Sequence, residues 1–347
     1  TLEGIDGNIL NGIISGSIPV AIYRITGDII IEQGDTVYMD AGTKFLFDEY
    51  HHFNIYGTLK AIGTESDSII FDNWVNTEKW YGFTLDGVSD ATEFKYVRIS
   101  GAKKSVRGGG MFLTSSSPTL SNVTISNNEG YQGGGIGINY DSNPILTNVT
   151  IADNVSEGGG GVYINDSTPI FTNVIISGNS AVGVNNNNGG GVYLWAASPI
   201  FTDVSISGNH ADSKCGGICI WSGSDPILTN VTIVNNNANL YGGGLYINGA
   251  NSILTNSIIW ANSPESIYLI SGTPLITYSD IEDGWEGEGN INADPLFTDP
   301  DNGDYTLGES SPCIDAGTAD LDDDGEDDIE YVGAAPDMGA FEFGAVY

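Results

Sequence analysis

Residues 158–179 read GGGGVYINDSTPIFTNVIISGN, and this stretch decides the fold because much of the chain repeats it. A glycine cluster comes first, then an apolar–x–apolar run around Tyr163, a polar turn with Pro169, and a second alternating run that ends before Asn179. Alternation with a period of two is typical of β-strands, and the apolar spacing of an amphipathic helix is absent. Each unit therefore predicts short strands joined by tight corners.

The unit recurs with a period of about 25 to 30 residues. A propeller blade needs roughly 40 to 50 residues, which is too long for this period. One coil of a parallel β-helix fits it, so we predict an all-β solenoid. The glycine clusters that mark successive coils are Gly108–Gly110, Gly133–Gly135, Gly158–Gly161, Gly189–Gly191, Gly216–Gly217 and Gly242–Gly244.

An asparagine recurs at one position of the second run, and Asp203 replaces it once. Asparagine tolerates the left-handed backbone that a sharp corner requires, and stacked asparagine side chains can hydrogen-bond to one another. We therefore expect a corner ladder along the solenoid. Its members are Asn122, Asn148, Asn173, Asp203, Asn230 and Asn256.

Composition changes along the chain predict three parts. Residues 1–24 are expected to be an N-terminal cap, residues 25–285 the parallel β-helix, and residues 286–347 an acidic C-terminal cap rich in Asp, Glu, Gly and Pro. Caps are expected because a stack of coils exposes unpaired strands at both ends.

The net charge of −35 excludes nucleic acid as a partner, since such a surface repels phosphates. The sequence contains no run of about 18 apolar residues, so we predict no membrane span. It opens without a signal peptide, as a mature secreted protein would. Cys215 and Cys219 are four residues apart in what reads as one strand. Their Cα atoms would then lie about 13 Å apart, so we expect three free thiols.

Aromatic side chains recur after the glycine clusters. If the residues after each cluster alternate in, out, in, the outward column contains Tyr163, Tyr193 and Tyr246, and Trp195 and Trp221 extend it. Exposed flat rings with polar neighbours would stack against sugars. The competing interpretation is that these rings stack on each other for stability.

An acidic loop at residues 320–328 reads DLDDDGEDD. Asp320, Asp322 and Asp324 match the first carboxylates of a calcium loop, and Asp328 matches a later one, but Tyr331 stands where a bidentate Glu is expected. We predict a structural Ca²⁺ site here, because adjacent carboxylates repel each other without a cation. The alternative is a solvated acidic loop.

Half of the basic residues lie between Lys95 and Arg107. A lyase that β-eliminates uronate sugars needs a Lys or Arg base, which Lys103, Lys104 or Arg107 could supply. The later coils hold few cations, and no carboxylate pair stands out for glycoside hydrolysis.

With these motifs, the chain resembles the pectate-lyase-like superfamily of right-handed parallel β-helices, and within it the secreted bacterial surface and adhesin-type β-helix proteins. The endings SPCIDAG (residues 311–317) and DMGAFE (residues 337–342) carry that resemblance. It covers nearly the whole chain and implies fold more strongly than function.

We therefore expect an extracellular protein, secreted or on a cell surface, with an adhesive, carbohydrate-binding or structural role and no enzymatic activity. Its partner would be a polysaccharide or cell-surface glycan, or further copies of itself. A Ca²⁺-dependent polysaccharide lyase is the alternative.

Overall fold

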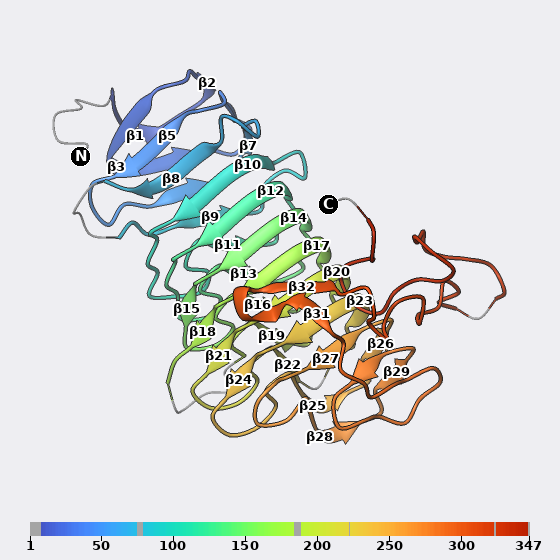
Figure 1. Cartoon of the computed structure of the whole chain (residues 1–347). Helices are drawn as coiled ribbons and strands as arrows, with labels where there is room; N and C mark the ends of the chain where they lie inside the picture. The colour runs from blue at the N-terminus through green and yellow to red at the C-terminus, as the bar shows by residue number, and fades with distance from the viewer. Residues whose placement is uncertain (1–7, 75–78, 184–188, 222, 323, 346–347) are drawn as a thin grey trace.

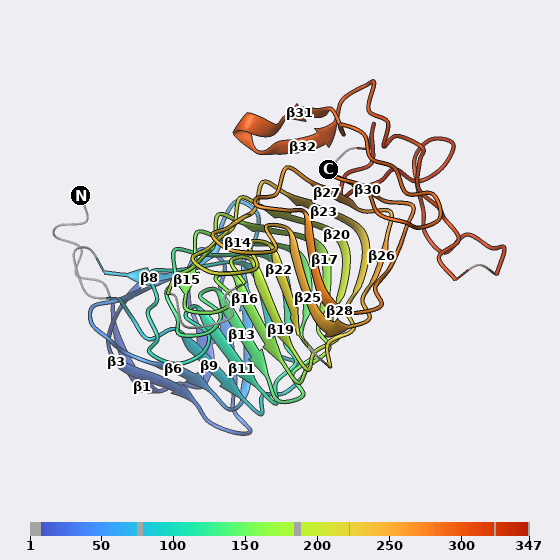
Figure 2. The same cartoon turned by 90° about the horizontal axis from the view of Figure 1, so that it is seen from below.

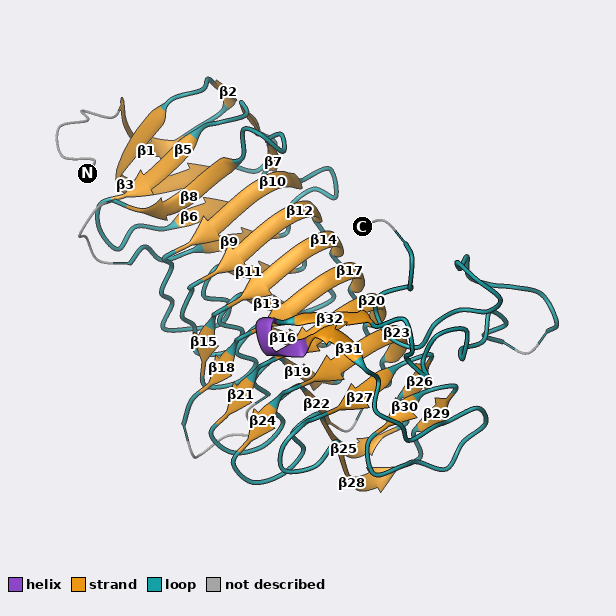
Figure 3. Cartoon of the chain, in the orientation of Figure 1, coloured by secondary structure: helices purple, strands orange, loops and turns teal. Residues whose placement is uncertain are grey.

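The computed structural model describes residues 8–74, 79–183, 189–221, 223–322 and 324–345. Its strands stack as successive coils of a parallel β-helix, with β1 to β3 at one end and the C-terminal segment beside β20 and β23 (Figure 1). Among the described residues the only helix is the 3₁₀ helix η1 (Pro300–Asn302) (Figure 3). The predicted β-solenoid is confirmed.

One regular coil shows how the repeat folds. The strand β16 (Val162–Asn165) follows the glycine cluster, the long strand β17 (Ile170–Ser177) follows the proline turn, and the short β18 (Ser180–Ala181) closes the coil. Each pairs in parallel with its counterpart in the next coil, for example Tyr163 with Tyr193. The period of the sequence is thus one turn of the solenoid.

The short strands after the glycine clusters form one face of the stack, and β9 and β28 extend this face on either side. In chain order they are β9 (Phe83–Asp86), β11 (Met111–Thr114), β13 (Ile136–Asn139), β16, β19 (Val192–Trp195), β22 (Ile218–Trp221), β25 (Leu245–Ala250) and β28 (Ile267–Gly272).

The long strands form the other two faces, because a residue with left-handed backbone bends each of them in the middle. They are β10 (Glu93–Ser100), β12 (Thr119–Ser126), β14 (Ile145–Ala152), β17, β20 (Ile200–Ser207) and β23 (Ile227–Val234). All six members of the corner ladder have φ between 51° and 55°, as the sequence predicts.

In the flanking coils two separate strands can take the place of one long strand: β7 and β8 both pair with β10, and β26 and β27 both pair with β23. The N-terminal set comprises β1 (Asn8–Ile13), β2 (Gly16–Ile18), β3 (Ile22–Ile31), β4 (Thr36–Met39), β5 (Lys44–Phe47), β6 (Phe53–Ile55), β7 (Thr58–Ile62) and β8 (Ile69–Asn73). The C-terminal set comprises β26 (Ile253–Thr255), β27 (Ile258–Trp260), β29 (Leu275–Thr277) and β30 (Asp280–Ile281). Parallel pairing already begins with β1 on β3, inside the range expected for the N-terminal cap.

Stacked apolar side chains fill the interior. Phe171 and Phe201 stack with ring centroids 4.8 Å apart, and Phe45 lies on Phe71 at the same distance. These rings continue columns of Leu, Val and Ile that are fully buried. Burial of a continuous column is what stabilises a solenoid, since no coil buries its own face alone.

A second asparagine column lies inside the stack, where each unit closes. In this closing ladder each Nδ2 donates to the Oδ1 of the next coil over 2.9 to 3.1 Å, and its residues are almost fully buried. Its amides satisfy the backbone carbonyls of a corner that would otherwise be buried without partners. The members are Asn128, Asn154, Asn179, Asn209, Asn236 and Asn262.

The glycines of each cluster are required for two different reasons. Gly159 has φ +67°, which L side chains rarely adopt, and a Cβ on Gly160 would collide with the carbonyl oxygen of Gly190 in the next coil. The cluster therefore lets neighbouring coils approach closely at this corner. The next column contains small residues, Ala181, Ala211 and Ala238, on the strands β18, β21 (His210–Ala211) and β24 (Asn237–Ala238), and β15 (Val155–Ser156) precedes them in the same sheet.

The expectation of three free thiols is wrong. Cys215 and Cys219 form a disulfide, and their Cα atoms are 5.0 Å apart. The estimate of about 13 Å assumed one extended strand, whereas Cys215 has φ 65° and lies in a turn that ends where β22 begins at Ile218. Cys313 is free and buried.

The C-terminal segment contains an antiparallel hairpin, β31 (Phe297–Asp299) with β32 (Asp304–Leu307). In the view of Figure 2 this hairpin lies outside the stack of coils. Two hydrogen bonds join the segment to the solenoid: the Gly339 N–H donates to the Asn256 carbonyl, and the Ala340 N–H donates to Thr232 Oγ1. None of the described helical segments has the length or hydropathy to cross a lipid bilayer.

Candidate functional site

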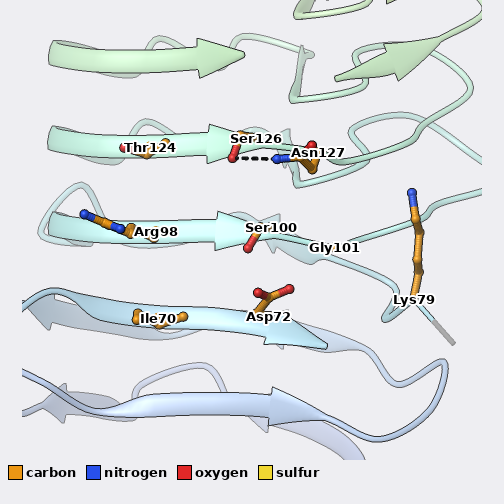
Figure 4. Close-up of a pocket in the computed structure, with 9 residues that line it drawn as sticks. All are labelled: Ile70, Asp72, Lys79, Arg98, Ser100, Gly101, Thr124, Ser126 and Asn127. Atoms are coloured by element: carbon orange, nitrogen blue, oxygen red, sulfur yellow. Dashed lines mark hydrogen bonds between the residues drawn. The ribbon is translucent and has the colours of Figure 1, made fainter. Parts of the chain in front are cut away.

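A groove of about 790 Å³ crosses the outer face of β8, β10 and β12. Figure 4 shows Arg98 at one end of it and Lys79 at the other, with Asp72, Ser100 and Ser126 between them. Thr124, Asn127, Ile70 and Gly101 complete the lining. The groove therefore presents hydroxyl, amide and charged groups from three neighbouring coils.

The strand alternation explains why these side chains face outward. Arg98 pairs in register with Ile70 on β8 and with Thr124 on β12, while its neighbours Val97 and Ile99 point into the core. Successive residues of a strand face opposite sides, so one column of each coil is available at the surface. Position 101 of the lining requires glycine, because a Cβ there would lie 2.7 Å from Asp72 Oδ1.

The cations of the groove differ in what they contact. Lys79 lies 3.6 Å from Glu129, which also accepts a 2.6 Å bond from Lys103, and this bond holds the pKa of Glu129 below its usual value. The Arg98 side chain is exposed and makes no ion pair or hydrogen bond with the other described residues. A free guanidinium can bind a carboxylate through two parallel hydrogen bonds.

Lys104 is buried on a different face, over β9 and β11. Its Nζ donates to the Phe83 carbonyl at 3.2 Å and to Thr84 Oγ1 at 2.7 Å, between the rings of Tyr81 and Phe112. Burial lowers the pKa of Lys104 to about 7. With no carboxylate to pair with among the described residues, this amine exists in both protonation states near neutral pH.

Arg107 belongs to another part of the surface. Its guanidinium donates to Gln132 Oε1 and Asn139 Oδ1, each at 2.7 Å, and covers the ring of Tyr163 at 5.3 Å. It lines a separate pocket of about 440 Å³ with Phe112 and Tyr131. Lys103, Lys104 and Arg107 are thus engaged by different protein groups.

The prediction that the column of tyrosines is exposed is wrong. Tyr163, Tyr193 and Tyr246 are only 5%, 6% and 1% exposed, and they form a cluster with the Cys215–Cys219 disulfide. The strand alternation points them outward, but residues just before two of the glycine clusters cover that face. Arg107 lies over Tyr163 and Lys214 over Tyr246, each at 5.3 Å, and Cys215 packs in the same cluster. Tyr163 and Tyr193 stack on each other at 5.3 Å, as the alternative interpretation expects.

The two tryptophans lie nearer the surface. Trp195 is 46% exposed and lies 6.1 Å from Trp221, which is half-buried beside Tyr246. These two indoles are the part of the predicted aromatic column that a ligand could reach.

The acidic loop brings three of its four predicted ligands together. One carboxylate oxygen from each of Asp320, Asp322 and Asp328 lies within 4.8 Å of the others. Repulsion from Asp324 chiefly raises the pKa of Asp322. Asp324 is outside the trio, and its backbone N–H donates to Asp320 Oδ1 at 3.1 Å. Such a set of hard oxygen donors fits Ca²⁺.

Sequence reasoning included Arg98 only in the basic stretch between Lys95 and Arg107 and missed the groove around it. Lys79, Asp72 and the hydroxyl groups come from different coils, and only the register of β8, β10 and β12 brings them together. The outward positions of consecutive coils, read as one column, are the signal that could have located it.

Comparisons with known proteins agree with this architecture. Residues 8–225 match the model of the family described as the right-handed beta helix region. Among curated proteins, none matches this sequence. The solved structure of pectate lyase Pel9A is similar, with a TM-score of 0.51 and 16% identity over 92% of this chain and 87% of that one. At that identity the likeness shows the fold alone. The chain belongs to the right-handed β-helix family and has a pectate-lyase-like fold.

Proposed function

We propose that this chain is an extracellular β-helix that binds an acidic polysaccharide in the groove over β8, β10 and β12 without cleaving it. The observation that carries the proposal is the Arg98 guanidinium, which has no ion pair or hydrogen bond with the other described residues and lies at one end of a groove lined by hydroxyl and amide groups. Carboxylated sugars offer a carboxylate for the guanidinium and hydroxyls for the polar lining. Coils spaced about 4.8 Å apart would present these groups at regular intervals along a sugar chain.

The charge of the chain affects the conditions for binding. The chain carries 10 basic and 45 acidic residues. Arg98 is one of several described cations without an ion pair, and its position in the groove is what distinguishes it. The surrounding negative surface slows the approach of a polyanion, and we expect binding to strengthen with Ca²⁺ or moderate salt.

The disulfide supports a location outside the cytoplasm. Disulfides persist in oxidising compartments and are rare where thiol buffers keep cysteines reduced. The Cys215–Cys219 bond is buried against Tyr163, Tyr193 and Tyr246, which favours a permanent structural bond.

Binding tests on a panel of acidic and neutral polysaccharides, with and without Ca²⁺, address the proposal. Arg98→Gln should weaken binding to acidic chains at least tenfold and leave the circular dichroism spectrum unchanged. Arg24→Gln is the matched control, since Arg24 is an exposed arginine outside the groove that already pairs with Asp48 at 2.9 Å. Equal loss in both variants would show a general charge effect and no groove.

Two other outcomes would change the proposed function. Equal binding of neutral and acidic chains would remove the role given to Arg98. No binding to any member of the panel would favour a purely structural surface protein or one that associates with itself.

A polysaccharide lyase is the second candidate function, because the fold resembles that of a pectate lyase and Lys104 is partly neutral near pH 7. A β-elimination needs a base that reaches the proton beside the uronate carboxylate. Lys104 is 3% exposed and its Nζ faces protein acceptors, which argues against this role. Ultraviolet absorbance of unsaturated products in the same incubations, lost in Lys104→Met, would establish the lyase.

We also propose that the trio Asp320, Asp322 and Asp328 holds a structural Ca²⁺. Three carboxylates so close together repel each other, and a divalent cation offsets this repulsion.

A further inference from the structure

The face of short strands ends at β28. In the preceding coils the first residue of each short strand donates its N–H to a carbonyl of the following coil over 2.8 to 2.9 Å. These pairs include Val192 with Gly217, Ile218 with Gly244, and Leu245 with Ser266. Ile267 holds the same position in β28, which pairs only with β25 among the described strands. The strand β28 is therefore an edge, and the N–H and C=O groups of Ile267 and Leu269 point away from β25.

The chain closes the other two faces of this end itself. The Tyr278 N–H donates to the Glu288 carbonyl at 2.7 Å, and the Ile281 N–H donates to the Ile291 carbonyl at 3.0 Å. Residues 288–291 therefore cover the edge beside β29 and β30. No backbone bond of this kind reaches β28 from the described part of the chain. Figures 1 and 2 show β28 as the last strand of its face, away from the hairpin of β31 and β32.

The edge at β28 is uncharged in a strongly acidic chain. Residues 266–279 contain no Asp, Glu, Lys or Arg, although the net charge is −35. Glu265 precedes them, and its Oε1 accepts from the Gly242 N–H at 2.9 Å, so this carboxylate is directed back to the preceding coil. The register irregularity of β28 begins only after Leu269. Charged side chains and bulges commonly protect edge strands from pairing, and the first half of β28 has neither.

The edge also exposes the end of the core. Leu269 continues the core column of Ile247, which is fully buried, yet Leu269 itself is 39% exposed. Ile270 beside it is 51% exposed. In the earlier coils the next strand covers this column. A strand laid on β28 would bury the same kind of surface.

We propose that β28 is the interface of a homodimer, in which it pairs antiparallel with β28 of a second copy across a two-fold axis. An extended strand is the partner that satisfies the free N–H and C=O groups of an edge at regular spacing. A second copy offers such a strand with the same uncharged, apolar edge, and the two-fold axis makes each contact twice. The opposite end of the solenoid fits this edge less well, because β1 contributes only Gly12 and Ile13 to the same sheet.

Acidic residues near the edge determine the conditions for pairing. Asp283, Glu286 and Glu288 are exposed in the segment that covers the other two faces, and each copy carries a net charge of −35. Salt screens the repulsion between them, so dimerisation should strengthen as the salt concentration rises. The interface shares no residue with the groove at Arg98, so the two proposals are independent.

Sedimentation velocity of the whole chain over a range of concentrations tests the proposal. The wild type should show a monomer–dimer equilibrium in moderate salt. Ile270→Glu should raise the dimer dissociation constant by about tenfold or more, because two like charges would meet at the interface. The matched control is Ile145→Glu, which makes the same change at an isoleucine that is 45% exposed on another face. This control should leave the dissociation constant unchanged.

Leu269→Pro is the second variant. The Leu269 N–H points away from β25, so proline removes no bond between β25 and β28 but blocks pairing at the edge. The circular dichroism spectrum should stay unchanged while the dimer is lost. In the wild type, amide hydrogen exchange at Ile267 and Leu269 should slow as the dimer forms.

Three outcomes overturn the proposal. One is a wild type that stays monomeric at every protein and salt concentration. Another is equal weakening of the dimer by Ile270→Glu and Ile145→Glu, which would show a general charge effect and no interface at β28. The third is a series of polymers that lengthen with concentration, which would mean open-ended stacking of β28 on β1.

Discussion

Lys104 shows how far one buried side chain can depart from its usual behaviour. It occupies a corner column where the later coils carry Ser156, Ala181 and Ala211, and its longer chain reaches the outer face of β9. Two acceptors and two ring faces surround the amine, yet no carboxylate compensates its desolvation within the described residues.

Stability should therefore depend on pH through this residue. The folded pKa of Lys104 is about 7 against an unfolded value of 10.5, so between them the unfolded chain binds more protons and stability rises with pH. The slope is at most about 1.4 kcal/mol per pH unit. Denaturant unfolding across this window should show a smaller slope in Lys104→Met than in the wild type. Identical slopes would contradict the lowered pKa.

Asp280 gives the opposite dependence at the base of the C-terminal cap. It is fully buried, accepts from the Cys313 thiol at 3.2 Å and from the Ala293 N–H at 3.1 Å, and burial raises its pKa to about 6. The folded chain holds the proton more tightly than the unfolded chain, with its value of 3.8, so stability rises as pH falls from about 6 toward 3.8.

Asp280→Asn should remove this gain. The measurement is the difference in unfolding free energy between variant and wild type across the same pH range, which cancels the contribution of the other carboxylates. The assignment of this window to Asp280 fails if that difference is constant with pH.

Each long strand combines a buried column with an exposed one. Leu146 is fully buried, whereas its neighbour Ile145 is 45% exposed and heads a column of half-exposed isoleucines on β14, β17, β20 and β23. Core packing selects the residues of the buried column, whereas strand propensity selects those of the half-exposed column.

The two columns should respond differently to substitution. Leu146→Ala leaves a cavity in the stacked core and should destabilise the chain by about 2 to 5 kcal/mol. Ile145→Thr keeps a β-branched residue at a half-exposed position and should cost less than about 1 kcal/mol. Urea unfolding of both variants compares them. Similar losses would mean that the exposed column also carries packing energy.

The coils and the C-terminal segment differ in how they are stabilised. Coils of the solenoid share continuous sheets, while residues 308–345 contain no strand among the described positions and rely on few hydrogen bonds and many carboxylates. The segment is bonded to the solenoid at Asn256 and Thr232, and the preceding strand β32 is bonded at Asn235, whose Nδ2 donates to the Tyr305 hydroxyl at 3.2 Å.

Chelation should therefore act on the C-terminal segment first. Removing Ca²⁺ should lower the melting temperature and open residues 308–345 to protease, while the coils stay resistant. The cause is the uncompensated repulsion among Asp320, Asp322 and Asp328. Asp322→Asn with Asp328→Asn should reduce the sensitivity to chelator. An unchanged cleavage pattern would show that the loop holds no ion.

The sequence by itself determined the solenoid, its period and its corners. Gly160 and Asn148 have local reasons to be where they are, close coil contact and left-handed backbone, and such reasons repeat visibly along the chain. The tertiary structure decided what no local pattern contains. Tyr163 points outward but is covered by turns, Cys215 reaches Cys219 because the chain turns before β22, and Lys104 is buried although its neighbours in sequence are polar. The groove at Arg98 likewise depends on which coils become neighbours, because it combines residues of different coils, such as Asp72 with Arg98.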